Sequence, residues 1–267
     1  MVKTPFSFNT ITDFLISQPL TIDVEIDDHY SGCFSVKGIE LEATVLYAGI
    51  SDFARLSVEL SPAGMLIYLN MFLVWMRESS LIEHFCVIER FLDNALVLLF
   101  SKRFGSEDPF VDALHVARWM GDHDAMKFCP DIGIASGTVM VGYTGTPKEY
   151  STSVFGPPLI LSAGCARLNP RGDVASMITF PAGEWRERSF DDVFQPIEYS
   201  HPEKGKTTQP QTWILGDPRE VDFPGTGRIA LRDIANVIHS MPSVSAEKKA
   251  REWVDLIRAK GFYKKND

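Results

Sequence analysis

The segment EATVLYAGI, residues 42–50, most constrains the fold. It is a continuous apolar run rich in β-forming residues, which is typical of a strand covered on both faces. The next signal, SPAG at 61–64, predicts the start of a helix, with Ser61 as its N-cap and Pro62 in its first turn. We expect this helix to run to about Ser80, so the chain begins its main domain as strand then helix.

The segments that follow complete a recognisable order of elements. CVIERFL (86–92) and ALVLLF (95–100) predict two strands joined at Asp93-Asn94, a pair typical of tight turns. A helix is expected near 109–125, then a second hairpin in DIGIASG and TVMVGYTG that turns at Ser136-Gly137. EYSTSVFG predicts a strand, and PPLILSAGCARL predicts a helix opened by proline. The β-α-β-β-α-β order indicates an α/β (α+β) fold with a ferredoxin-like core.

The flanking regions suggest three divisions of the chain. Residues 1–41 form a strand-rich lead-in with a possible short helix, and residues 42–216 form the main domain. Residues 217–267 contain a linker and two predicted amphipathic helices, near 228–241 and 245–260. Trp253, Leu256 and Ile257 share one face of the second helix, which makes this C-terminal extension a candidate for docking a protein partner or for dimerisation.

Composition limits the classes of partner. Lys and Arg number 26 against 35 Asp and Glu, a formal net charge of −9. This balance disfavours duplex nucleic acid and anionic membranes, although a local basic pocket for a triphosphate is compatible with it. The four cysteines form no CxxC pair, so zinc and a disulfide framework are not expected. The start of the chain lacks a signal-peptide pattern, and the longest apolar stretch, residues 65–76, is too short to cross a bilayer. We expect a cytoplasmic protein.

Several sequence motifs, in the same order along residues 42–216, resemble those of the catalytic domain of class III adenylate/guanylate cyclases. VLYAGISDFARLSVELSP is similar to the family's VLFADIRGFTxLSExLSP, and RFLDNALVLLF to KFIGDALMAVF. IGIASGTVMVG is similar to IGIHTGEVVVG, SVFGPPLILSAGCARL to TVIGDAVNLAARL, and GKTTQPQTWILGD to the closing KGKSEPVEVYRL. The EATVLYA run, preceded by CFSVKG, also looks like the bacterial pyrimidine cyclases of antiphage signalling.

The resemblance implies a two-metal reaction. In this family two carboxylates hold two divalent ions, Mg or Mn, at a site shared between two chains of a head-to-tail dimer. The positions of those carboxylates are occupied here by Gly49 and Asn94. Glycine has no side chain, and a neutral amide binds Mg²⁺ poorly compared with a carboxylate. The metal chemistry is therefore expected to be lost.

The nucleotide-binding positions are changed in part. The base-reading lysine corresponds to Arg90, which keeps the charge but changes its geometry, and the Asp/Thr position corresponds to Ser153. The asparagine and arginine of the late helix depend on the alignment. Anchoring on Gly156 puts Ile160 and Gly164 at those positions, whereas anchoring on the CARL ending puts Ala163 and Arg167 there. The asparagine is lost in both alignments.

Three hypotheses follow from these substitutions. The first is a catalytically inactive pseudo-cyclase, a homodimer that binds a nucleoside triphosphate or cyclic nucleotide through Arg90, Ser153 and Arg167, or regulates a partner, with no metal cofactor. The alternative is an active nucleotidyl cyclase that makes 3′,5′-cyclic NMP and pyrophosphate, with a preference for pyrimidines and with Asp52 and Asp93 as relocated Mg or Mn ligands. Against it, Asp52 can cap the following turn, and Asp93-Asn94 is ordinary turn chemistry. The third is a pocket for an unrelated small molecule.

Overall fold

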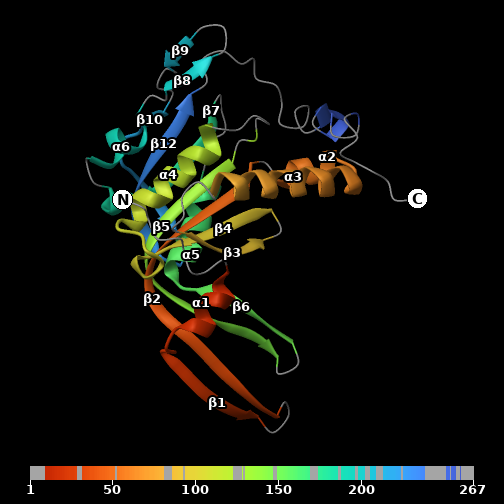
Figure 1. Ribbon diagram of the computed structural model, residues 1–267, viewed down its shortest axis with the longest axis vertical. Coiled ribbons are helices and arrows are strands. Elements are labelled where there is room, and N and C mark those ends of the chain that lie inside the picture. The colour runs from red at the N-terminus through yellow and green to blue at the C-terminus, as the bar shows by residue number, and fades with distance from the viewer. Residues whose placement is uncertain are drawn as a thin grey trace.

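The computed structural model is a mixed α/β structure built on one large sheet (Figure 1). It describes residues 10–28, 32–51, 53–80, 86–92, 94–122, 128, 130–146, 149–168, 174–185, 188–195, 198–201, 205–208, 213–223, 225–237, 251–252, 254–256 and 259. Its helices are α1 (Ile11–Ser17), α2 (Phe53–Glu59), α3 (Pro62–Ser80), α4 (Pro109–Asp122), α5 (Pro157–Arg167) and α6 (Arg188–Val193), with short turns η1 (Lys102–Phe104) and η2 (Ala182–Glu184). Its strands are β1 (Ile22–Asp28), β2 (Gly32–Ile50), β3 (Cys86–Leu92), β4 (Ala95–Phe100), β5 (Pro130–Thr146), β6 (Glu149–Phe155), β7 (Val174–Pro181), β8 (Glu198–His201), β9 (Gly205–Thr208), β10 (Trp213–Leu215), β11 (Arg219–Phe223) and β12 (Gly227–Val237).

The strand order confirms the ferredoxin-like core. The sheet runs β10-β12-β7-β5-β2-β4-β3, with β1, β6 and β11 paired to β2, β5 and β12, while β8 and β9 form a separate pair. Within it, β2, α3, β3, β4, α4 and β5 come in this order in the chain, with the short α2 and η1 between them, and their strands lie in the order β5-β2-β4-β3. This is the predicted β-α-β-β-α-β arrangement. The longest strand, β2, continues without a break through residues 41 and 42, where the lead-in was expected to end.

Local signals positioned these elements well. Leu92 pairs with Ala95, so β3 and β4 are joined by a two-residue turn at the predicted position. The Ser61 hydroxyl accepts a hydrogen bond from the backbone N–H of Gly64 at 3.1 Å, as an N-cap does, and α3 runs from Pro62 to Ser80 as expected. The predicted helices at 109–125 and 157–168 are α4 and α5.

The predicted turn at Ser136-Gly137 is wrong. β5 is continuous from Pro130 to Thr146, and Ser136 and Gly137 pair with Thr44 and Ala43 of β2. Gly137 has φ +149°, a conformation that glycine adopts readily, and a Cβ there would lie 3.2 Å from Pro158 Cγ of α5. This glycine therefore serves the close approach of α5 to the strand, and the hairpin turn comes later, between β5 and β6.

The prediction of a helix near 228–241 is also wrong, because residues 228–237, the part of this range that the structure describes, belong to the strand β12. β12 lies between β7 and β10 and is covered on both faces: Leu231 packs beside Cys165 of α5, and Ile234 lies in the core on the other face. A strand buried on both faces has no simple alternation of polar and apolar residues, so its pattern resembles that of a helix. In the described part of the C-terminal extension, residues 228–237 are therefore strand and not helix.

The sheet separates two apolar layers. Leu46, Ala48 and Ile50 of β2 face the main core with residues of α3 and α4, whereas Val45 and Tyr47 face the second cluster, which includes α1 and α5 residues. This alternation is the two-residue period of a strand covered on both faces. It confirms the interpretation of residues 42–50 as a strand buried on both sides.

The described end of the chain returns to the body. Residues 251–252, 254–256 and 259 are helical, as predicted for the second C-terminal helix. Among its described residues, Val254 is buried and Leu256 is exposed, while Trp253 and Ile257 of the predicted face lie outside the described residues. None of the helices in the described part is long and apolar enough to span a membrane.

Candidate functional site

The two positions that correspond to the metal carboxylates lie side by side at one end of the sheet. Gly49 pairs with Ala95, the first residue of β4, and the backbone N–H of Ile50 donates a 3.0 Å hydrogen bond to the carbonyl oxygen of Asn94. Asn94 is half-buried at the turn that precedes β4. The sheet therefore brings the end of β2 and the turn before β4 together, and a site that uses both segments needs this proximity.

Space at Gly49 is restricted by an aromatic ring. A Cβ built there would lie 3.2 Å from Cε1 of Tyr47 and 3.9 Å from the carbonyl oxygen of Asp131. The Tyr47 side chain is buried, with 6% of its surface exposed. A side chain at position 49 would thus need the ring to shift by a few tenths of an ångström.

A carboxylate that the sequence analysis missed flanks this position. Asp131, near the start of β5, is the register partner of Gly49 on the side away from β4, and it is half-buried. Residues directly opposite each other in an antiparallel pair project to the same face of the sheet. Asp131 directly precedes the IGIASG motif in the sequence, but that it lies opposite Gly49 depends on the register of the strands.

The remaining candidates divide between the two ends of β5. Ser153 of β6 pairs with Gly142, which is eleven residues from Asp131, or about 35 Å along an extended strand. Ser153 is 2% exposed, and its hydroxyl accepts a 3.4 Å hydrogen bond from the hydroxyl of Thr144. Arg167, by contrast, is exposed at the end of α5 nearest Asp131. In one chain, Ser153 and Gly49 are too far apart to contact the same nucleotide.

The position of Arg167 follows from a close helix–strand contact. At Gly133, two residues along β5 from Asp131, an added Cβ would lie 1.8 Å from the Ser162 carbonyl oxygen and 2.7 Å from the Ala166 nitrogen. The last turn of α5 therefore packs directly on this part of β5. Arg167 follows Ala166, so the end of α5 that carries it lies toward the Gly49 end of the sheet and not toward the Ser153 end.

Three predicted candidates have no described side chain. Asp52 and Asp93 lie outside the described residues, and only the backbone of Arg90 is described. That backbone pairs with Val97 after a register shift between Ile88 and Arg90. Such irregularities bend a strand and redirect the residues that follow. The roles of these three residues stay predictions.

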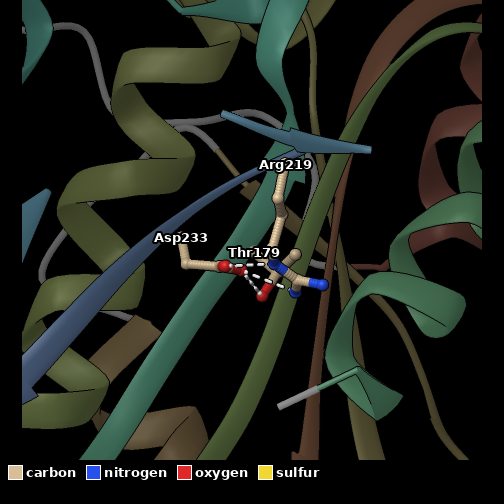
Figure 2. Close-up of polar contacts among 3 residues, drawn as sticks. All are labelled: Thr179, Arg219 and Asp233. Atoms are coloured by element: carbon tan, nitrogen blue, oxygen red, sulfur yellow. Dashed lines mark hydrogen bonds and ion pairs between the residues drawn. The ribbon is translucent and has the colours of Figure 1, made fainter. Parts of the chain in front are cut away.

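Two polar clusters lie elsewhere in the sheet. Figure 2 shows the carboxylate of Asp233 in β12 directed toward both Thr179 of β7 and Arg219 of β11. The Thr179 hydroxyl donates to Asp233 Oδ1 at 2.8 Å, and Arg219 Nε donates to Oδ2 at 2.6 Å. This hydrogen bond and the charge of Asp233 raise the pKa of Arg219. The cluster ties three strands together.

The second cluster joins η2 to β5. Glu184 accepts hydrogen bonds from the backbone N–H of Ser136 at 2.7 Å and from its hydroxyl at 2.5 Å, and Thr44 lies 2.8 Å from the same hydroxyl. Burial raises the pKa of Glu184, and the two bonds from Ser136 oppose that shift. Burial also raises the pKa of Cys165 of α5 to about 12, with Glu184 and Asp233 adding to the effect. Neither cluster involves the Gly49 end of the sheet.

Solved structures with similar folds include nucleotidyl cyclases. The adenylyl cyclase CyaB from P. aeruginosa superposes with a TM-score of 0.55 at 16% identity, over 78% of this chain and 99% of that one. The guanylate cyclase domain of RhGC from Catenaria anguillulae, in complex with GTP, gives a TM-score of 0.54 at 14% identity, over 74% and 99%. The catalytic core of a rhodopsin-guanylyl cyclase with converted specificity, in complex with ATPαS, gives 0.55 at 14% identity, over 74% and 98%.

The chain has the fold of a nucleotidyl cyclase domain. This agrees with the resemblance seen in the sequence words, and nearly the whole length of each cyclase domain is covered. No protein-family model matches the sequence, and no curated protein matches it significantly. Identities of 14–16% show the fold and leave the activity to be argued from the residues.

The residues at positions 49 and 94 do not fit the two metal ions of the cyclase reaction. Gly49 offers no side-chain donor, and Asn94 offers an amide where a hard divalent cation favours carboxylate oxygen. Across the described residues, no three His, Cys, Asp or Glu side chains gather as a metal site requires. No catalytic step through a metal is derived for this arrangement.

Proposed function

We propose that this chain is a catalytically silent cyclase-fold protein that binds a nucleoside triphosphate or cyclic nucleotide in the cytoplasm and acts by regulation. The observation that carries the proposal is the pair Gly49 and Asn94, joined through the Ile50–Asn94 hydrogen bond, at the two positions where a metal carboxylate is expected. Loss of one group that stabilises charge in a transition state typically costs about 10²–10³-fold in rate. Loss of both ligands leaves the scaffold without its main source of catalysis.

The binding partner is a nucleotide because the cationic candidates are retained. Arg90 keeps the positive charge of the base-reading lysine, and Arg167 is exposed at the end of α5 that lies beside Asp131 and Gly49. A guanidinium forms paired hydrogen bonds with phosphate oxygens and stacks on aromatic rings, so an arginine suits either end of a nucleotide. The solved cyclase domain from Catenaria anguillulae, which shares this fold, is in complex with GTP.

The proposed assembly is a homodimer, because within one chain the candidate nucleotide-binding residues lie at opposite ends of β5. Ser153 lies about 35 Å along β5 from the partner of Gly49. A second chain in the opposite orientation would bring the Ser153 end of one subunit to the Gly49 end of the other. Each nucleotide would then contact residues of both subunits.

The test measures binding and turnover on the same preparation. Thermal shift is recorded with ATP, GTP, CTP, UTP and their cyclic forms, with and without Mn²⁺, and each triphosphate reaction is examined by mass spectrometry for cyclic product. We expect stabilisation by at least one nucleotide and no cyclic product above a no-protein control. Product clearly above that control would overturn the silent assignment, and no stabilisation by any nucleotide would overturn nucleotide binding.

An active cyclase with relocated ligands is the second candidate, favoured by Asp131. This carboxylate lies opposite Gly49, so it occupies the place in the sheet closest to the missing one, where Asp52 and Asp93 are also expected. This candidate predicts Mn²⁺-dependent product that is lost in Asp131→Asn, Asp52→Ala and Asp93→Ala. Wild-type activity in all three variants would reject relocated ligands.

A further inference from the structure

The C-terminal helix contacts α2, the helix that follows the Gly49 end of β2, although the two helices are far apart in the sequence. Arg251 Nη2 donates a 2.8 Å hydrogen bond to Glu59 Oε2 and lies 3.4 Å from the Glu59 carbonyl oxygen, across 192 residues. Glu59 is the last residue of α2. A cation at the C-terminal end of a helix interacts favourably with the exposed carbonyl groups and with the helix dipole. Arg251 therefore caps α2.

A second contact lies one turn further along the same helix. Val254 is 4% exposed, and its Cγ1 lies 3.9 Å from the Cβ position of Gly64, in the first turn of α3. Residues three apart lie on one face of a helix, so Arg251 and Val254 contact the body together. The C-terminal helix thus spans the α2–α3 corner, with one contact on each side of it.

The corner is connected directly to the candidate site. Two residues, Ser51 and Asp52, separate the end of β2 from the start of α2. Because α2 has seven residues, it cannot be stable by itself and depends on what it packs against. On its inner side Leu56 is buried in the core, while Arg251 holds its final residue from outside. α2 thus connects the Arg251 contact, through the chain, to the end of β2 that carries Gly49.

We propose that Arg251 is a positioning residue for the nucleotide site, acting through Glu59 and α2 on the segment that leaves Gly49. The proposal rests on the nucleotide-binding function proposed above. It gives the C-terminal extension a defined role: a ligand or partner that displaces this helix lowers nucleotide affinity, and nucleotide binding in turn favours the docked helix. Coupling of this kind is reciprocal for binding free energies.

The test compares the full-length wild type with Arg251→Ala, Arg251→Lys and the charge exchange Arg251→Glu/Glu59→Arg. Arg228→Ala is the matched control, because Arg228 forms an exposed ion pair with Glu220 at 3.8 Å on the hairpin of β11 and β12. Hydrogen exchange of residues 53–59 is measured without nucleotide, and the dissociation constant is measured for the nucleotide triphosphate that gives the largest thermal shift.

For Arg251→Ala we expect faster exchange in residues 53–59 and a dissociation constant raised about three- to fivefold, the range that loss of a partly exposed ion pair allows. Arg251→Lys and the charge exchange should recover both properties toward wild type, and Arg228→Ala should change neither. Faster exchange with unchanged affinity overturns the positioning role, because it leaves a purely structural contact. Unchanged exchange overturns the contact itself.

Failure of the proposed function gives a different result. If the wild type binds no nucleotide, both the nucleotide-binding function and the positioning role are overturned, whereas the exchange measurement, which needs no nucleotide, still reports on α2. If the wild type binds a nucleotide but Arg251→Ala binds it equally well, the positioning role alone is overturned.

Discussion

The backbone N–H of Ile50 donates a 3.0 Å hydrogen bond to the carbonyl oxygen of Asn94. This bond ties the end of β2 to the β3–β4 turn, so that positions 49 and 94 are neighbours. The two positions that correspond, by the resemblance, to the metal carboxylates of class III cyclases are therefore adjacent in the fold. Position 49 lacks a side chain, and the Tyr47 ring, 3.2 Å from its Cβ position, limits the space for one.

Restoring both carboxylates should restore metal binding. In Gly49→Asp/Asn94→Asp we expect Mn²⁺ at ten times its dissociation constant to stabilise the fold by about 1.4 kcal/mol, raising the melting temperature by about 2–4 °C. The new side chain at position 49 requires a small shift of the Tyr47 ring, 3.2 Å away. Wild type and both single variants are the controls in the same thermal denaturation series, and absence of a Mn²⁺-dependent shift in the double variant would contradict the prediction.

Gly133 should tolerate no side chain. In Gly133→Ala the new methyl group would lie 1.8 Å from the Ser162 carbonyl oxygen and 2.7 Å from the Ala166 nitrogen, so α5 must move away from β5. We expect a loss of more than about 3 kcal/mol of unfolding free energy, or no soluble protein. Gly183→Ala, with no atom within 4 Å of the new methyl group, is the control in urea denaturation. Equal stability of the two variants would show that the contact is absent in solution.

Glu184 should make stability depend on pH. Burial raises the pKa of this carboxyl above 4.5, so the unfolded chain releases its proton first as the pH rises. The folded state then loses stability relative to the unfolded state until Glu184 itself ionises, after which the difference is constant. Glu184→Gln has no such proton. The melting temperature of Glu184→Gln relative to wild type should therefore increase with pH above about 4.5 and then level off. A pH-independent difference would contradict the raised pKa.

Asp233 should contribute more to stability than either of its partners in Figure 2. Its side chain is 17% exposed and accepts hydrogen bonds from both Thr179 and Arg219. We expect Asp233→Ala to cost about 2–3 kcal/mol, since two donors lose their acceptor, and Thr179→Val to cost about 1 kcal/mol. The Arg219 side chain is 38% exposed, so Arg219→Ala should cost less unfolding free energy than Asp233→Ala. Urea denaturation of the three variants gives the order, and a larger loss for Thr179→Val than for Asp233→Ala would contradict it.

Local sequence signals predicted much of this fold correctly. The cap at Ser61, the two-residue turn before Ala95 and the proline that opens α5 all depend on residues close together in the chain. The two errors have one cause. Ser136-Gly137 has turn composition but lies within β5, and residues 227–237 have a helix-like pattern but form β12. In both, pairing with strands distant in sequence overrides local preference.

The sequence by itself determined the order of elements in the core and the absence of carboxylates at positions 49 and 94, because both are properties of local residue pattern and of residue identity. Tertiary structure alone decided that Asp131 lies opposite Gly49, that Ser153 lies at the far end of β5, and that Arg251 caps α2. These relationships depend on strand register and on the docking of a helix against a distant corner. They are fixed by long-range pairing and packing, which no short segment of the chain specifies.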